Sequence, residues 1–176
     1  MVGFAFSPNL KANIYEALRM AHYFGGELVF VHVGRKTPEK ESIFNEIVGS
    51  SPVQSEKISV HWRIGDPVRT LLQASKDFGV DLILLGALKR ENVLKFYLGS
   101  IARKITRKAK CSVLLLINPS IERQPCQHIV VNGLDSPQTK LTIEAAFVVA
   151  NALGVKKISL IELSLIHISE PTRRTP

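Results

Sequence analysis

Short aliphatic runs alternate with segments of helical periodicity along most of the chain. Most of these runs are continuous, as in strands that are buried on both faces of a sheet. Strands that alternate with helices require right-handed crossovers, so the sequence predicts a five-stranded, mostly parallel α/β sheet with helices on both faces. The expected strands are Val2–Phe6, Leu28–Val33, Ile58–Ile64, Asp81–Leu85 and Ser112–Ile117.

Capping residues predict where the helices begin and end. Ser7-Pro8-Asn9 offers an N-cap for the first helix, and Gly25-Gly26 ends it. Asp66 is placed to cap another helix, with Pro67 at its first position, where the missing N–H has no intrahelical partner. The expected helices are Leu10–Phe24, Glu39–Val48, a segment from Pro67 to Phe78, and residues 100–110, where Ile101, Ile105 and Ala109 should form the buried side.

The chain begins to repeat itself near residue 128. Ser7-Pro8 recurs as Ser136-Pro137, and Ala17 and Gly25 recur at the same spacing as Ala146 and Gly154. This repeat stops after a second strand, and a β-α-β piece of about 35 residues is too small to bury a stable core alone. The sequence therefore predicts one complete domain, a linker, an incomplete second copy and a tail, at 1–118, 119–127, 128–162 and 163–176.

The tail does not continue the repeat. Residues 163–173 are similar to the conceptual translation of a transposase-type sequencing adapter, so we expect no biological function for residues 163–176.

The net charge of +8 allows an anionic partner, and much of it lies between Lys89 and Lys110. Within the helix expected at residues 100–110 no aromatic residues interleave with the charges, so a solvated helix face is expected and no nucleic-acid partner. No apolar run approaches the roughly 18 residues that span a bilayer, and no export signal is indicated, so we expect no membrane segment in this fragment and a cytoplasmic location. Cys111 and Cys126 form no C-x-x-C pair and are interpreted as ordinary thiols.

A glycine pattern marks the expected ligand site. Gly86 ends the fourth strand, and Gly99-Ser100 opens the next helix, whose free N–H groups can hold an anion. Glycine lets the backbone approach phosphate oxygens and adopt positive φ. Ligands of such sheets bind beyond the carboxyl ends of the strands, so the loops after Phe6, Val33, Ile64 and Leu85 are the candidates.

This spacing resembles the nucleotide-binding signature of the universal stress protein family: glycine, two residues, glycine, nine residues, then glycine and serine or threonine. The resemblance extends over residues 2–117 through Ser7-Pro8, Val31-His32-Val33, Gly65-Asp66-Pro67 and the strand that starts at Cys111. It implies a Rossmann-like, adenine nucleotide alpha hydrolase-like fold and a stress-response module that binds a nucleotide or another anion and signals without catalysis. ATP or another adenine nucleotide is the implied ligand, and the implied nucleotide-binding residues are Ser7, Val33, Gly86, Lys89, Gly99 and Ser100. The implied partner is a second copy, as a homodimer or as the second tandem domain.

Two positions depart from the family pattern. Lys89 replaces the second glycine of the signature, and Ala5 stands where ATP-binding members usually carry an acidic residue. If position 89 needs positive φ, a lysine there costs about 1–2 kcal/mol. Two interpretations stay open, a weak adenine-nucleotide site and a vestigial pocket.

Catalysis is not expected, because the sequence holds no G-x-S-x-G, Walker A or H-E-x-x-H motif. Ser7 suits a capping role, and His22 and His32 suit structural roles. The alternatives are a cytosolic regulatory domain of a membrane transporter and a nucleotide-hydrolysing enzyme of the related α/β superfamily.

Overall fold

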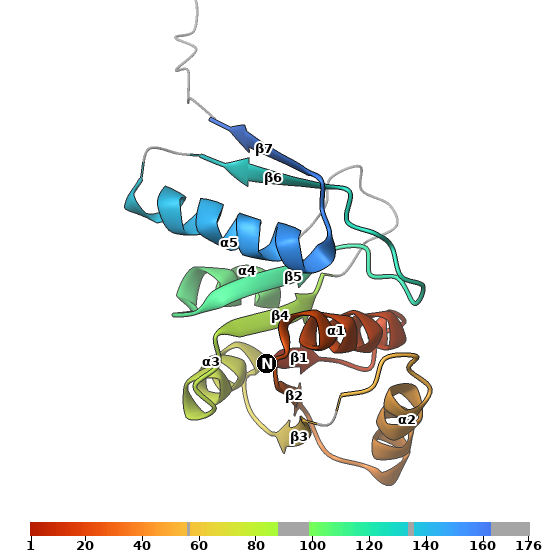
Figure 1. The fold of residues 1–176 in the computed structure, drawn as a ribbon. Helices are drawn as coiled ribbons and strands as arrows, with labels where there is room; N and C mark the ends of the chain where they lie inside the picture. Colours follow the sequence, from red (N-terminus) through yellow and green to blue (C-terminus); the bar gives the residue numbers. More distant parts are fainter. Residues whose placement is uncertain (56, 88–98, 134–135, 163–176) are drawn as a thin grey trace, which may run out of the picture. The chain divides into compact units, whose positions relative to one another are not determined.

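The computed structural model describes residues 1–55, 57–87, 99–133 and 136–162 (Figure 1). The chain forms two compact units, Met1–Gln124 and a second one that begins at Pro125. No helix in the described part of the chain is long and apolar enough to cross a membrane.

The first unit is built on a parallel sheet, as predicted. Its strands run in the order β3-β2-β1-β4-β5, and every neighbouring pair is parallel. The short strand β1 is central, because Val2 pairs with Phe30 on one side and with Leu84 on the other. The strands are β1 (Val2–Phe4), β2 (Leu28–Val33), β3 (Ile58–Arg63), β4 (Leu82–Gly86) and β5 (Ser112–Leu116).

Strand β1 ends two residues earlier than predicted, at Phe4 instead of Phe6. The chain turns there, and the N–H of Ser7 donates to the carbonyl of Ala5 at 2.9 Å. The aromatic side chain of Phe6 suggested a strand residue, but it packs outside the sheet, against His32 and Trp62.

Four helices connect these strands: α1 (Leu10–Phe24), α2 (Pro38–Gly49), α3 (Pro67–Asp77) and α4 (Ser100–Lys108). The start of α1 differs from the prediction, because its N-cap, Asn9, makes no side-chain capping hydrogen bond and the N–H of Leu10 donates to the backbone carbonyl of Ser7 at 2.9 Å. Other ends follow the predicted signals. The carboxylate of Asp66 accepts the N–H of Arg69 at 2.9 Å, with Pro67 at the first helical position. Helix α1 ends at Gly25, whose φ of 61° is left-handed.

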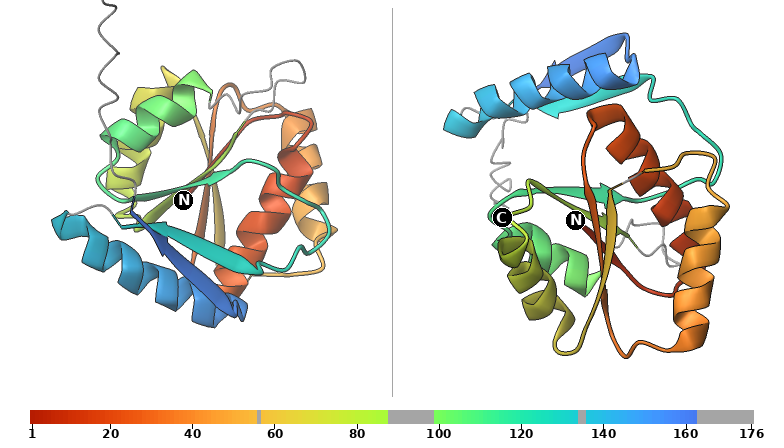
Figure 2. Two further views of the ribbon diagram at one scale, coloured as in Figure 1. Left: turned by 90° about the horizontal axis from the view of Figure 1, so that it is seen from above. Right: turned by 60° about the horizontal axis from the view of Figure 1, so that its bottom comes forward.

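The helices cover the sheet in pairs. Helices α1 and α2 lie on one face and α3 and α4 on the other, so the sheet is the middle of three layers (Figure 2). Ile14 and Leu18 of α1 pack with Phe30 in one core, and Ile83 packs with Ile105 in the other; all five side chains are completely buried. Each face of the sheet therefore carries its own apolar core.

The buried side of α4 differs from the prediction. Ala102 and Ile105 are buried, whereas Ile101 is 43% exposed. The prediction assumed that buried residues recur every four positions. Instead Ala102 and Ile105, three positions apart, pack against α3 and the sheet. Ile101 is thereby left at the edge of the cavity described below.

The second unit has a parallel pair of strands, β6 (His128–Asn132) and β7 (Lys157–Ile161), connected by α5 (Pro137–Leu153). Its helix ends at Gly154 with a φ of 70°, much as α1 ends at Gly25. The order strand, helix, glycine, strand is the one expected for the start of a second copy, and the predicted tail lies outside the described residues.

Arg19 of α1 holds the segment after β5 against this helix by hydrogen bonds. Its buried guanidinium donates to the carbonyl of Ile121 at 2.9 Å and to that of Ser120 at 2.5 Å, and it pairs with Glu16 at 3.0 Å. Charge-assisted bonds of this kind are stronger than neutral ones. Residues 120 and 121, predicted to lie in a linker, are thus held against α1.

We predict that Arg19→Leu lowers the free energy of unfolding by about 1–3 kcal/mol, because two carbonyl acceptors lose their donors. Urea unfolding of the whole chain measures the change. Arg107→Leu, on the exposed side of α4, should stay within about 0.5 kcal/mol of the natural chain. In a shorter chain that ends at Asn118, Arg19→Leu should lower the free energy of unfolding much less, because residues 120 and 121 are absent. An equal loss in the whole and the shortened chain would contradict this role of Arg19.

Candidate functional site

The strand order creates a crevice at one edge of the sheet. From β1 the chain continues to β2 on one side, while β4 lies on the other side, so the connections leave these strands in opposite directions. In open α/β sheets, ligands bind at such a switch point, beyond the carboxyl ends of the strands. The ends of β1 and β4 are Phe4 and Gly86.

A cavity of about 330 Å³ lies at this point, within the usual size range of small-molecule sites. It is walled by the ends of β1, β2 and β4 and by parts of α1, α3 and α4. Five of the six predicted site residues line it, and the sixth, Lys89, lies outside the described residues. These five are Ser7, Val33, Gly86, Gly99 and Ser100.

The start of helix α4 provides the anion-attracting part of the cavity. Gly99 is its N-cap, and no side chain caps the helix there. The first N–H groups of the helix have no intrahelical partners, and the helix dipole adds partial positive charge. A Cβ built on Gly99 would meet no atom of the described residues within 4 Å, so that part of the chain leaves space beside this backbone for a ligand.

Neither Gly86 nor Gly99 has the positive φ that glycine allows. Gly99 has a φ of −54°, and Gly86 is not among the residues with positive φ. For Gly86 the physical reason for glycine is steric instead. At Gly86 a Cβ would lie 2.4 Å from Nδ2 of Asn13, so the absence of a side chain makes room for that amide.

Asn13 is a site residue that the sequence prediction missed. It lies on α1 and lines the cavity, and its Oδ1 is buried without a hydrogen-bond partner among the described residues. The signal was present, because Asn13 follows Leu10 by three positions on the helix side that Ile14 and Ala17 also bury. An amide on an apolar stripe indicates a specific polar role.

The β2 side of the cavity is closed by a histidine in an aromatic cluster. His32 is buried, and its Nδ1 donates to the carbonyl of Phe4 at 3.0 Å. Its ring contacts those of Phe4, Phe6 and Trp62 at centroid distances of 5.1–5.3 Å. These contacts give His32 a packing role, in keeping with its predicted structural use. Ala5, at the position of the family's acidic residue, lines the cavity with a methyl group.

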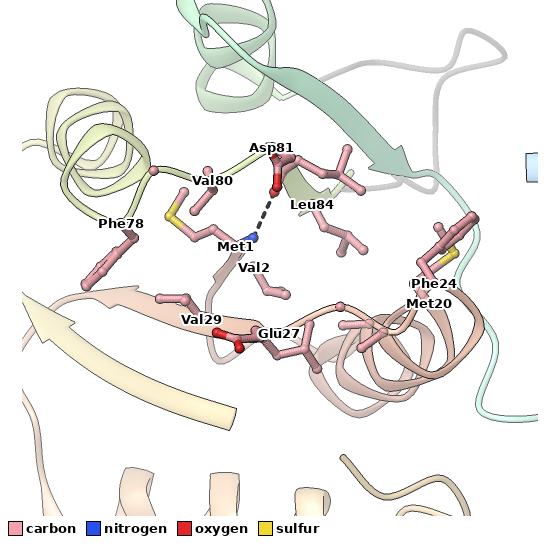
Figure 3. Close-up of a pocket in the computed structure, with 16 residues that line it drawn as sticks. Met1, Val2, Met20, Phe24, Glu27, Val29, Phe78, Val80, Asp81 and Leu84 are labelled. Atoms are coloured by element: carbon pink, nitrogen blue, oxygen red, sulfur yellow. Dashed lines mark hydrogen bonds between the residues drawn. The ribbon is translucent and has the colours of Figure 1, made fainter. Parts of the chain in front are cut away.

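A larger cavity of about 540 Å³ opens at the amino ends of the strands (Figure 3). The α-amino group of Met1 lies there and donates to the carbonyl of Leu82 at 2.8 Å, and burial lowers the pKa of that group. Helix α1 ends beside it at Phe24, and Phe78, the residue after α3, also lines it, so the negative ends of two helix dipoles lie near the carboxylates of Glu27 and Asp81. This field disfavours a phosphate, which makes the smaller cavity the better anion site.

The described residues contain no group of three or more His, Cys, Asp or Glu side chains that could hold a metal ion. Cys111 is partly buried and Cys126 is exposed, and both are free thiols.

We predict that Gly86→Ala lowers the free energy of unfolding by about 1–3 kcal/mol, because the new Cβ overlaps the Asn13 amide. Combining it with Asn13→Ala should recover part of this loss, since the overlapping group is then gone. Gly49→Ala is the matched control, because a Cβ there meets open space. Urea midpoints of the four chains test the contact, and a Gly86→Ala chain as stable as the natural one would contradict it.

Comparisons with known proteins agree with this architecture. Residues 50–116, which include α3, β4, α4 and β5, match the model of the Universal stress protein family. The curated Universal stress protein Sll1388 of Synechocystis is 24% identical over 92 residues, which cover 51% of this chain and 58% of that protein. The matched part thus spans less than two thirds of that relative's length.

Solved structures share the fold. Universal stress protein UspA from Lactobacillus plantarum is 18% identical with a TM-score of 0.50, and the match covers 66% of this chain and 96% of that one. A universal stress protein in complex with cAMP is 19% identical with a TM-score of 0.54, over 66% of this chain and 93% of that one. The chain is thus similar to universal stress proteins in part of its sequence, and it shares the fold of the solved ones.

Proposed function

We propose that the first unit, Met1–Gln124, is a universal stress protein domain that binds ATP or another adenine nucleotide and acts in stress signalling by binding, without catalysis. The observation that carries this proposal is the cavity at the carboxyl ends of β1, β2 and β4, together with the uncapped start of α4.

The lining of the cavity suits the two halves of a nucleotide. Apolar side chains such as Val31, Val33 and Leu71 offer a surface for a base, and the N–H groups that follow Gly99 offer donors for phosphate oxygens. A protein of this fold has been solved in complex with cAMP, which supports an adenine nucleotide as the class of ligand.

Weak binding is expected from the same lining. Ala5 offers no charge or hydrogen bond where the family usually places an acidic residue, so the backbone contacts to phosphate dominate. Such contacts are screened by salt and do not distinguish one nucleotide from another. We therefore propose a site of modest selectivity for ATP over ADP; a pocket that has lost its ligand is the competing outcome.

The polar side chains of the cavity favour binding over reaction. Ser7 carries its hydroxyl group at a turn and Ser100 at the start of a helix. The Nδ1 of His32 already donates a hydrogen bond to the carbonyl of Phe4. Nucleophilic catalysis needs a base within hydrogen-bond reach of the nucleophile. Among the described hydrogen bonds, His32 bonds to a backbone oxygen and not to a serine.

We predict that the whole chain binds ATP weakly, that binding weakens as salt rises from about 0.05 to 0.5 M, and that ATP is not hydrolysed appreciably. Gly99→Val should weaken binding at least about tenfold, because the new side chain fills the space beside the α4 N–H groups. Calorimetry measures affinity, and phosphate release measures turnover.

Gly49→Val is the control for this substitution, because that glycine also faces open space but lies on α2, outside the cavity. A valine N-cap costs about 1 kcal/mol of helix stability, so unfolding curves are recorded alongside. Tight, salt-independent binding would contradict the weak site, and equal binding by Gly99→Val would place the ligand elsewhere.

We also propose that β5 is the surface through which this unit pairs with another copy or with a complete second domain. It is an edge strand of the sheet, bonded to β4 only. Unpaired edges present free N–H and C=O groups to other strands. Ile117, directly after β5, is 47% exposed, which adds apolar surface to that edge.

We predict concentration-dependent dimers of the natural chain in sedimentation velocity. Ile117→Lys should shift the profile toward monomer, because a charge beside an edge strand opposes pairing. Ile43→Lys, at a side chain of α2 that is 45% exposed, removes similar apolar surface far from the edge strand and should leave the profile unchanged. A natural chain that stays monomeric at millimolar concentration would contradict the assignment.

A further inference from the structure

The carbonyl oxygen of the Asn13 side chain is an unpaired acceptor in the wall of the candidate nucleotide cavity. Oδ1 is buried and has no hydrogen-bond partner among the described residues. Leaving a buried acceptor unpaired costs free energy, and native proteins rarely do so without a reason. The atom needs a donor, and because Asn13 lines the cavity, a rotation of its side chain would turn Oδ1 toward a donor held there.

The surroundings of Asn13 preserve its amide. Gly86 lacks the Cβ that would lie 2.4 Å from Nδ2 and 2.9 Å from Oδ1. Asn13 lies on α1 and Gly86 ends β4, so two distant segments meet at the switch point of the sheet. A leucine at position 13 would fill a similar volume on this apolar stripe without an unpaired atom, so packing alone does not account for the amide.

The polarity of the unpaired atom restricts its partner. An acceptor needs a hydrogen-bond donor, and the oxygens of an ionised phosphate can only accept. A sugar hydroxyl or the exocyclic amine of a base can donate. Ala5, at the neighbouring end of β1, offers only a methyl group, so Asn13 is placed to supply a polar contact on this side of the cavity.

We propose that Asn13 is a specificity-determining residue, whose Oδ1 accepts a hydrogen bond from a hydroxyl or amine of the nucleoside part of the ligand. The inference rests on the proposed nucleotide binding and adds to it a polar recognition of the nucleoside, distinct from the phosphate contacts at α4. It also implies a conflict between function and stability, because the acceptor is unpaired when the cavity holds no donor.

The test compares the whole natural chain with Asn13→Leu, Asn13→Asp and the control Asn45→Leu, which lies at an exposed position of α2. Calorimetry measures binding of ATP, adenosine and inorganic triphosphate. We expect Asn13→Leu to weaken the binding of ATP and of adenosine at least fivefold and to leave the affinity for triphosphate unchanged. It should also raise the Tm of the unliganded chain, a shift that a merely structural amide would not give.

Asn13→Asp keeps an acceptor at this place, so it should still bind adenosine and remains informative if the leucine variant does not fold. Comparing adenosine with 2′-deoxyadenosine, 3′-deoxyadenosine and inosine shows whether the donor is a hydroxyl or the amine. Unchanged adenosine binding by Asn13→Leu, with the natural chain binding ATP, would overturn this inference and leave the proposed function intact. A natural chain that binds no nucleotide would overturn both.

Discussion

The pairing of β1 with both β2 and β4 is the interaction on which the rest of the first unit depends. Three residues, Val2–Phe4, form the centre of the sheet, and the chain reaches their two neighbours by routes that leave in opposite directions. That divergence opens the crevice beyond the carboxyl ends, brings α1 and α4 to its rim, and places Asn13 against Gly86. The same pairing gathers two helix C-termini and two carboxylates at the opposite edge, so the two cavities of the sheet differ in electrostatic character.

Much of this architecture was predictable, because it depends on local signals. Continuous aliphatic runs indicate buried strands, and Asp66-Pro67 or Gly25 mark helix ends through contacts within a few residues. The cavity residues beside strand ends and the glycine-serine pair were predictable for a similar reason, since parallel strands bring their carboxyl ends to one edge. The assignment of those residues to nucleotide binding remains a prediction.

The features that sequence did not predict depend on neighbours that are distant in the chain. Periodicity alone cannot choose between Ile101 and Ala102 as the buried residue of α4, because the choice is made by packing against α3 and the sheet. The end of β1 is set by aromatic contacts of Phe6 with β2 and β3. The contact of Asn13 with Gly86 depends on β4 ending beside α1, and the requirement for glycine at position 86 proved to be steric rather than conformational.

Gly86 and Gly99 differ in what a mutation would do to the fold, and this has an evolutionary consequence. A side chain at Gly86 collides with the protein itself, whereas one at Gly99 enters only empty space. Change at position 86 is therefore constrained by folding, whereas change at position 99 would, on the proposed function, be constrained mainly by the ligand. On the proposed function, single substitutions at the start of α4 could therefore change the ligand of such a domain while leaving its fold intact, so ligand recognition and fold could evolve independently.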